Sequence, residues 1–430
     1  MKLVYRKLEK KKLKAIVVDN IGGSYLPVAV NLTKYFDVYY HSVVQNPFPR
    51  MSTCNIGVGY PGITPVKDFW SNIDTWDIFI FPDIYFKDWG THLRQMGKMV
   101  WGANVSEDLE TDRKLFKTEL QNAGMSVAET QWITGVDSLI SYLKGQEDKW
   151  IKISYYRGDA ETFHHINWRQ TEVWINDLKV KLGPLGETLE FMVETGIDSI
   201  AEIGADGYTV NGVSPKSQLW GLEVKDLGYV GKAALVDSMP QPIIDIYRGF
   251  EPVLNKYSHT GFYSTEIRVG KDGNDYYTDP CMRAGSPPSS TYMDMITNWD
   301  EIIIGGCRGE VIEPKFGGLY GVEIILKSTF CYSNYMPVGF DEKYKGNIKI
   351  KGSFIQDGKN YVIPFDQAGI DEMKEFGSVV VIGDNIESIV NNALEIANSI
   401  DCYGLMFDEN ALDKAKESLG RIEEALNVKF

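Results

Sequence analysis

The sequence predicts an α/β protein with three parts: an N-terminal parallel α/β domain, a central α+β module and a small β-rich C-terminal domain. Three observations lead to this prediction. Short apolar strands alternate with helical patterns over residues 1–105, and a β-hairpin pattern lies near the end of residues 106–320. Several short strands and two helical patterns then follow over residues 321–430.

Composition limits the classes of function. The 430-residue chain carries 44 basic and 59 acidic side chains, a net charge of −15, so it is poorly suited to bind a nucleic-acid backbone. Its five cysteines show no paired spacing, which is typical of reduced thiols. No apolar run is long enough for a membrane span, and no secretory signal is expected. We therefore expect a cytoplasmic protein that binds neither membranes nor nucleic acid.

The N-terminal part alternates between strand and helix patterns. Apolar runs predict strands at Leu13–Asp19, Phe36–Tyr40, Asp77–Phe81 and Met99–Gly102, and a helix at Leu26–Tyr35. This alternation is typical of a parallel sheet covered by helices.

A long helix is predicted next, from Ser106 as N-cap to Gly124 as the residue beyond its C-terminus. Strands at Glu129–Thr134 and Lys149–Ser154 then flank a helix at Val136–Leu143.

Lys152 lies between two apolar residues in the predicted strand Lys149–Ser154, so it points to the opposite face from both of them. Two interpretations are open. The lysine side chain extends into solvent from an edge strand, or it extends into a cleft.

The middle of the chain predicts a strand at Leu189–Val193, a turn at Ala205–Gly207 and a strand at Tyr208–Val213. The spacing of Gly228 and Gly231 predicts a flexible loop there, and a helix is expected at Met239–Leu254.

Residues 262–287 give the most informative pattern. Strand Phe262–Val269, a turn at Lys271–Asn274 and a returning strand at Tyr276–Asp279 form a predicted hairpin. It would place Glu266 and Asp279 on neighbouring strands, where two carboxylates can share a cation such as Mg²⁺ near a nucleotide triphosphate. The alternative is a surface hairpin with two solvated acids.

After this hairpin, one further helix is predicted at Tyr292–Gly305. The C-terminal part then predicts short strands and two terminal helices, at Val322–Lys327, Asn347–Lys351, Lys359–Ile363, Ser378–Gly383, Asn385–Ala397 and Ala411–Ala425.

The hairpin with Arg283, Gly285 and Pro287 resembles the metal-binding end of the ATP-grasp ligases, and within them the glycinamide ribonucleotide synthetase (phosphoribosylamine–glycine ligase) family. The order of the elements resembles this family over nearly the whole chain, including the small C-terminal domain. The resemblance implies a pre-ATP-grasp domain at 1–105, an ATP-grasp module at 106–320 with a lid subdomain at about 125–195, and a β-rich C-terminal domain at 321–430.

The resemblance also assigns a nucleotide site. It implies that Lys152 meets the α and β phosphates, that Glu194 lies at the adenine hinge and that Glu202 holds the ribose hydroxyls. Lys114 matches a basic position of the helix that opens the module, as does Lys117. ATP and Mg²⁺ are therefore the implied cofactors.

For the metal, the resemblance implies Glu266 and Asp279 as ligands. Cys281 stands where the family carries Asn, and a thiol is a weak partner for Mg²⁺, so Cys281 is a doubtful third ligand. For the substrates it implies Arg283 together with three further residues, Ser217, Gln218 and Asp226. Lys152 and Arg283 are the implied catalytic pair.

A second departure lies in residues 155–165, where the family's glycine-rich loop retains only Gly158. Such a loop needs backbone freedom for its amides to surround the phosphates.

The resemblance implies a carboxylate–amine ligase that forms an amide through an acyl phosphate, joining an amino acid such as glycine to an amine. The implied partners are thus small molecules, and the expected state is a monomer or small homo-oligomer. Two alternatives stay open: a catalytically decayed fold that binds a nucleotide or metabolite, and a structural scaffold.

Overall fold

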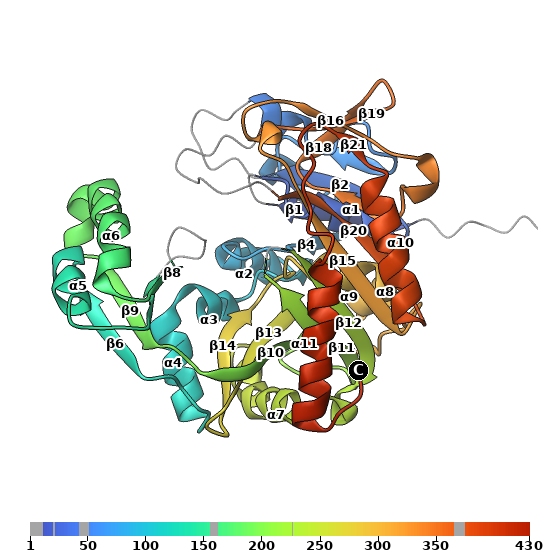
Figure 1. Ribbon diagram of the computed structural model, residues 1–430. Helices are drawn as coiled ribbons and strands as arrows, with labels where there is room; N and C mark the ends of the chain where they lie inside the picture. Colours follow the sequence, from blue (N-terminus) through green and yellow to red (C-terminus); the bar gives the residue numbers. More distant parts are fainter. Residues whose placement is uncertain (1–11, 20–21, 43–50, 155–161, 226, 365–374) are drawn as a thin grey trace, which may run out of the picture.

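The computed structural model describes residues 12–19, 22–42, 51–154, 162–225, 227–364 and 375–430. Within these residues the strands form four sheets, of five, eight, four and four strands. Figure 1 shows the N-terminal sheet and the small C-terminal sheet together at the top, the central sheet below them, and a separate arm to the left.

The N-terminal sheet is parallel, as predicted, with the order β3-β2-β1-β4-β5. Its central strand β1 has Ala15 to Val18 fully buried, because alternate residues enter two different cores, one on each face. The short strand β3 was not predicted. The elements of this part are β1 (Lys14–Asp19), α1 (Leu26–Leu32), β2 (Asp37–Ser42), β3 (Ile63–Pro65), β4 (Ile78–Ile80), α2 (Lys87–Gln95) and β5 (Met99–Trp101).

The predicted helix at residues 106–124 is interrupted. A short helix α3 (Asp108–Thr111) ends at Asp112, whose extended backbone and side chain cap a second helix, α4 (Arg113–Asn122). Ser106 is not the N-cap, because its hydroxyl lies 2.7 Å from His259 Nδ1. Gly124 follows α4 with φ +71°, a left-handed conformation that suits glycine.

The arm in Figure 1 is the lid subdomain, defined here as Thr130–Thr195. Its antiparallel sheet has the order β6-β9-β7-β8, and its apolar side chains form a core of their own. The helix α6 was not predicted. The elements are β6 (Thr130–Thr134), α5 (Val136–Leu143), β7 (Lys149–Ile153), β8 (Thr162–His165), α6 (Trp168–Leu182) and β9 (Glu190–Thr195).

The eight-stranded central sheet has the order β14-β13-β10-β11-β12-β15-β20-β17. One face packs on the helices α7 (Gln241–Lys256) and α11 (Ala411–Leu426), which lie beside it in both ribbon views. The lower part of the other face is open to a cleft. The strands are β10 (Ser199–Thr209), β11 (Ser217–Val224), β12 (Gly228–Leu235), β13 (Gly261–Gly270), β14 (Asp275–Cys281), β15 (Tyr320–Lys327), β17 (Ile348–Ile350) and β20 (Glu375–Gly383).

Two predictions in this sheet are wrong. Residues 205–207 are not a turn but the interior of β10, and the expected loop around Gly228 and Gly231 is strand β12. Glycine is required at position 207 for a reason other than a turn. A Cβ there would lie 1.9 Å from Gln218 Oε1 on the neighbouring strand. The glycine permits close strand packing rather than a turn.

The residues after 320 contribute both to the central sheet and to the small C-terminal sheet. Strand β12 pairs with β15 across the predicted boundary, so the central sheet continues beyond residue 320. The predicted helix at residues 292–305 is two helices, α8 (Ser289–Met295) and α9 (Trp299–Cys307). The remaining elements are β16 (Met336–Gly339), β18 (Ser353–Gln356), β19 (Lys359–Val362), α10 (Ile386–Asn398) and β21 (Asp401–Cys402).

None of the helices in the described ranges combines the length and apolar character that a membrane span requires.

Candidate active site

A cleft of about 790 Å³ lies between the lid subdomain and the open face of the central sheet. All parts of the chain contribute to it: Tyr25 from the N-terminal part, Lys152 from the lid, Glu266 and Arg283 from the central module, and Lys351 from the C-terminal part. Residues that are distant in sequence therefore meet at one place.

The hairpin places its two carboxylates as predicted, because Glu266 on β13 is the direct cross-strand partner of Asp279 on β14. Thr278 donates its hydroxyl to Glu266 Oε1 at 3.1 Å. Burial and the nearby Asp279 raise the pKa of Glu266 to about 7. A cation between the two carboxylates would relieve this repulsion.

These donors fit Mg²⁺ in one binding mode. In the part of the chain that the structure describes, no three His, Cys, Asp or Glu side chains are grouped to hold a metal. Mg²⁺ is commonly bound by one or two carboxylates together with phosphate oxygens and water, which Glu266 and Asp279 can satisfy. The Cys281 thiol lies near them and donates to the carbonyl oxygen of Arg283 at 3.5 Å.

Lys152 extends into the cleft. Its Nζ lies 3.2 Å from Asp279 Oδ2 and 3.7 Å from Glu194 Oε2, and Lys117 Nζ lies 2.6 Å from the other oxygen of Glu194. Burial favours the neutral form of Glu194, but the two ammonium groups outweigh burial and lower its pKa. This network joins the lid to the central sheet.

Lys114 does not extend into the cleft. Its side chain is 51% exposed and pairs with Glu190 at 2.9 Å. Arg113 lines the cleft instead, where Nη1 lies 3.6 Å from Asp279 Oδ1 and Nε donates to the Ile153 carbonyl at 3.0 Å. Arg113 and Lys117 are four residues apart on one face of α4, a spacing that predicts their common direction.

Glu202 lines the cleft on β10, and its Oε2 accepts a hydrogen bond from Arg268 Nε at 3.1 Å. The Arg268 guanidinium lies 5.7 Å from the ring centre of Trp150, which also lines the cleft. The sequence prediction missed both residues. Both could have been predicted from the alternation of side chains along a strand. Trp150 is two residues from Lys152 and Arg268 is two residues from Glu266, so each lies on the same face as its neighbour.

Arg283 is held at the inner end of the cleft. Its Nε donates to Glu110 Oε1 at 2.9 Å and its Nη1 to the Tyr25 hydroxyl at 3.2 Å. Glu110 also accepts the backbone N–H of Met282 at 2.7 Å, which fixes the turn that carries Arg283. No local pattern predicts Glu110 or Tyr25 as its partners.

Ser217 and Gln218 do not line the cleft. Gln218 is buried and bonds to the backbone N and O of Tyr208, each at 3.3 Å. Ser217 lines a separate surface depression formed with Leu235 and Phe316. Asp226 lies outside the described residues, as does the loop containing Gly158.

Lys351 was not predicted and enters the cleft from the C-terminal part. Its Nζ donates to Ser286 Oγ at 2.7 Å and also pairs with Glu375. It therefore links the residues after the hairpin to strand β20.

No family model matches the sequence, and no curated protein sequence matches it significantly. Solved structures do match. A phosphoribosylamine–glycine ligase from Thermotoga maritima is 15% identical with a TM-score of 0.69, and the match covers 93% of this chain and 100% of that one. The chain has the ATP-grasp fold. The fold prediction from the hairpin and the order of elements is thereby confirmed.

Other ATP-grasp structures match over similar lengths. The biotin carboxylase domain of a 2-oxoglutarate carboxylase from Hydrogenobacter thermophilus is 10% identical with a TM-score of 0.65, covering 95% of this chain and 99% of that one. An L-amino acid ligase from Bacillus licheniformis is 13% identical with a TM-score of 0.56, covering 93% and 100%. At such identities the likeness establishes the ATP-grasp fold and leaves the substrates open.

Proposed function

We propose that the protein is an ATP-dependent carboxylate–amine ligase, which joins an amino acid to an amine through an acyl phosphate. One observation carries the proposal: Lys152 of the lid lies 3.2 Å from Asp279, the cross-strand partner of Glu266. An ammonium group beside two paired carboxylates is an arrangement suited to a nucleotide triphosphate with a divalent cation.

The charges along the cleft support this use. Lys152 and Arg113 flank Asp279, so both can turn their hydrogen-bond donors toward phosphate oxygens. Mg²⁺, when bound with the nucleotide at Glu266 and Asp279, would reduce the repulsion between the phosphate oxygens. At the lid side, we assign Glu194 and Glu202 to the nucleoside, where a carboxylate accepts two ribose hydroxyls.

The proposed chemistry follows from the weakness of a carboxylate as an electrophile. A substrate carboxylate oxygen attacks the γ-phosphorus and ADP leaves. The amine nitrogen then forms a bond to the acyl carbon, the bond to phosphate breaks, and the amine proton leaves with the phosphate. Arg283 is the proposed group that orients the carboxylate or the transferred phosphoryl group, since a guanidinium fits either. No side-chain nucleophile is required.

The proteins with similar structures support an amino acid as the carboxylate. Two of them are named a phosphoribosylamine–glycine ligase and an L-amino acid ligase. A third was solved with MgADP and bicarbonate. We transfer from these names only the class of reaction.

Calorimetric titration with ATP, with and without Mg²⁺, tests the nucleotide site. We expect Mg²⁺-dependent binding that weakens at least about tenfold in Lys152→Ala, since one charge-assisted hydrogen bond contributes about 1.5–3 kcal/mol. Lys179→Ala is a matched control, because this lid lysine pairs with Asp137 on the exposed surface. Absence of ATP binding in the folded wild-type protein would reject the ligase.

Turnover separates a ligase from a protein that only binds nucleotide. We expect ADP release to depend on an amino acid and an amine, and to fall by about two orders of magnitude or more in Asp279→Asn. A nucleotide-binding protein would bind ATP and release no ADP with any substrate pair. Circular dichroism of the variant checks that its fold is retained.

A further inference from the structure

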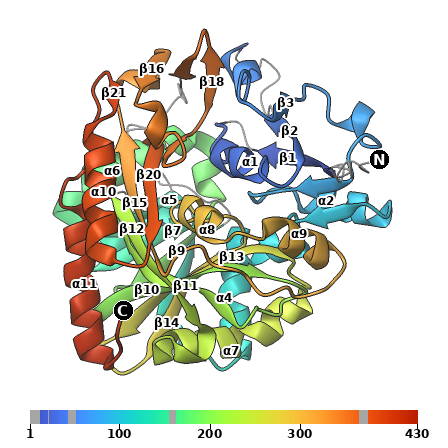
Figure 2. The ribbon, with the colours of Figure 1, turned by 90° about the vertical axis from the view of Figure 1, so that its right-hand side faces the viewer.

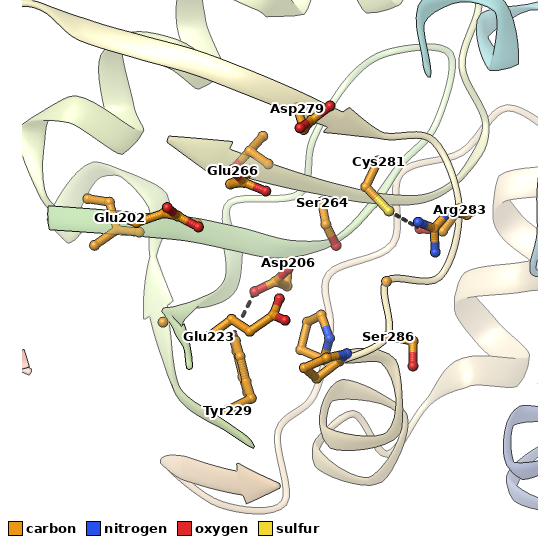
Figure 3. A pocket seen from close by; sticks show the side chains of 17 residues that line it. Glu202, Asp206, Glu223, Tyr229, Ser264, Glu266, Asp279, Cys281, Arg283 and Ser286 are labelled. Atoms are coloured by element: carbon orange, nitrogen blue, oxygen red, sulfur yellow. Dashed lines mark hydrogen bonds between the residues drawn. The ribbon is translucent and has the colours of Figure 1, made fainter. Parts of the chain in front are cut away.

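A hollow of about 160 Å³ adjoins the cleft behind Glu266 and Asp279. Figure 3 shows it between the sheet and the turn that carries Ser286. Its lining includes Gly204 and Gly221, so backbone rather than bulky side chains faces the space at these two positions. The hollow shares Arg283 with the cleft, so a molecule bound in it would lie next to the proposed reaction site.

The lining of the hollow is strongly acidic. Five carboxylates contribute, and Arg283 is the one basic residue among the lining residues that the structure describes. That arginine already bonds to Glu110 and Tyr25. The negative charge therefore favours a cationic ligand. The five acidic residues are Glu202, Asp206, Glu223, Glu266 and Asp279.

The arrangement disfavours a metal ion in the hollow. Among the residues that the structure describes, no three acidic side chains converge closely enough to chelate one ion. The carboxylates are spread over strands β10, β11, β13 and β14 instead. Acids spread in this way suit an extended organic cation rather than a compact one.

Ser264 gives an independent indication of a ligand. The residue is 6% exposed and lines the hollow, and among the described residues its Oγ has no hydrogen-bond partner in good geometry. A buried hydroxyl without a partner is costly, typically about 1–3 kcal/mol. In Figure 3 it points toward the same space as Asp206 and Glu223.

Asp206 lies at the inner end, where it accepts a hydrogen bond from the Tyr229 hydroxyl at 2.7 Å. Burial raises the pKa of Asp206 to about 6, although Tyr229 and the nearby Ser264 hydroxyl oppose this rise. A bound cation would offset the cost of burying this carboxylate.

We propose that this hollow binds the amine substrate and that the substrate is a short aliphatic diamine. One protonated amino group is held by Asp206 and Ser264. The other nitrogen lies at the Glu266 end beside Arg283 and reacts as the neutral amine. It forms a bond to the acyl carbon, the bond from that carbon to the phosphate oxygen breaks, and one amine proton leaves with the phosphate. The far ammonium keeps its charge throughout. The volume of the hollow, about 160 Å³, is roughly that of five water molecules in the liquid, and a chain of roughly six heavy atoms fits this space.

This inference rests on the proposed function for the reacting nitrogen, but binding tests it separately. The probe is 1,4-diaminobutane, titrated calorimetrically into the full chain without ATP. We expect the wild-type protein to bind this diamine, and Asp206→Asn to bind it at least about tenfold more weakly. The wild-type protein should also bind butylamine, which lacks the second ammonium, about tenfold more weakly than the diamine. Asp237→Asn is the control, since this exposed acid pairs with Arg248 and does not line the hollow.

Ser264→Ala keeps the test decisive if Asp206→Asn fails to fold. Within the described residues this variant loses no well-aligned hydrogen bond in the free protein, so weaker diamine binding at unchanged stability indicates a ligand contact. The proposal would be overturned if the wild-type protein bound no diamine. It would also be overturned if both variants bound diamine with the affinity of the wild-type protein. If diamine binds but ATP does not, the ligase fails and the hollow remains. If ATP binding depends on Lys152 but diamine does not bind, the diamine site is rejected and the proposed ligase function stands.

Discussion

Glu107 is a buried carboxylate outside the cleft. Its Oε2 accepts the backbone N–H groups of Phe86 at 2.9 Å and Lys87 at 3.1 Å, at the start of α2, whereas Oε1 has no hydrogen-bond partner in good geometry among the described residues. Burial raises the pKa of Glu107 to about 8, and the nearby Asp83 adds to the rise, although the backbone bonds oppose it. The folded protein therefore binds this proton more tightly than the unfolded chain.

This difference predicts a pH dependence of stability. Because the folded-state pKa is raised, the contribution of Glu107 is fully present below the ordinary pKa of about 4.3 and is lost as pH rises toward about 8. Each unit of pKa difference corresponds to about 1.4 kcal/mol. We expect the free energy of unfolding of Glu107→Gln to exceed that of the wild type by a few kcal/mol at pH 8 and to differ little at pH 4.5. Denaturant unfolding at both pH values measures this difference. The same difference in the free energy of unfolding at pH 8 and at pH 4.5 would contradict the prediction.

Single residues were predictable where strand parity alone decides their direction. Lys152 points into the cleft because Ile151 and Ile153 are buried on the opposite face, and Glu266 meets Asp279 because a short turn fixes the register. Lys351 reaches the cleft from a distant part of the chain. No local pattern specifies such a direction, because only the assembled fold brings these segments together.

Helix α4 couples local capping to the site. Asp112 Oδ1 accepts the backbone N–H groups of Lys114 and Leu115, each at 3.0 Å, and the first turn that it fixes carries Arg113 into the cleft. We expect Asp112→Ala to lower stability by about 1 kcal/mol and also to weaken ATP binding a few-fold.

Asn385→Ala is the matched control for this prediction. Asn385 caps α10 in the same way, by accepting the Ser388 N–H at 2.9 Å, but α10 contributes no residue to the cleft. The control should lose similar stability and keep its ATP affinity. Equal ATP affinity in both variants would show that the cap does not position Arg113.

The elements that were predicted wrongly depend on distant neighbours. Glycines at 228 and 231 indicate a loop when only the local sequence is considered, yet β12 forms because β11 and β15 supply hydrogen-bonding partners on both sides. Gly207 similarly resembles a turn residue but provides close contact with Gln218. The 262–279 hairpin was predictable, because its two strands are close in sequence and joined by a short turn.

The parts of the molecule differ in how far they can fold alone. The lid has a separate apolar core, and Thr130 and Glu194, near its two ends, are direct cross-strand partners. In contrast, the C-terminal residues share the main core: Val322, Ile324 and Leu326 are fully buried in the same cluster as Val230 of β12. The central sheet crosses the predicted boundary at residue 320, because β12 pairs with β15.

This difference predicts opposite results for two deletions. A chain ending at residue 320 loses the partner of β12 and the helix α11, which packs against β11 and β12, and it exposes Trp220, whose ring lies 4.8 Å from that of Phe430. We expect no cooperative unfolding transition from it, since a bare strand edge and an uncovered apolar face favour aggregation.

Replacing residues 130–194 with a short glycine–serine linker should instead leave a body that unfolds cooperatively but no longer binds ATP, because Lys152 and Glu194 are removed. The paired strand ends lie roughly 5 Å apart, so a short linker can close the gap without strain. Calorimetric unfolding of both proteins checks the pair. A cooperative transition in the chain ending at 320 would mean that the first two parts fold independently of the third, and that the shared sheet adds little to their stability.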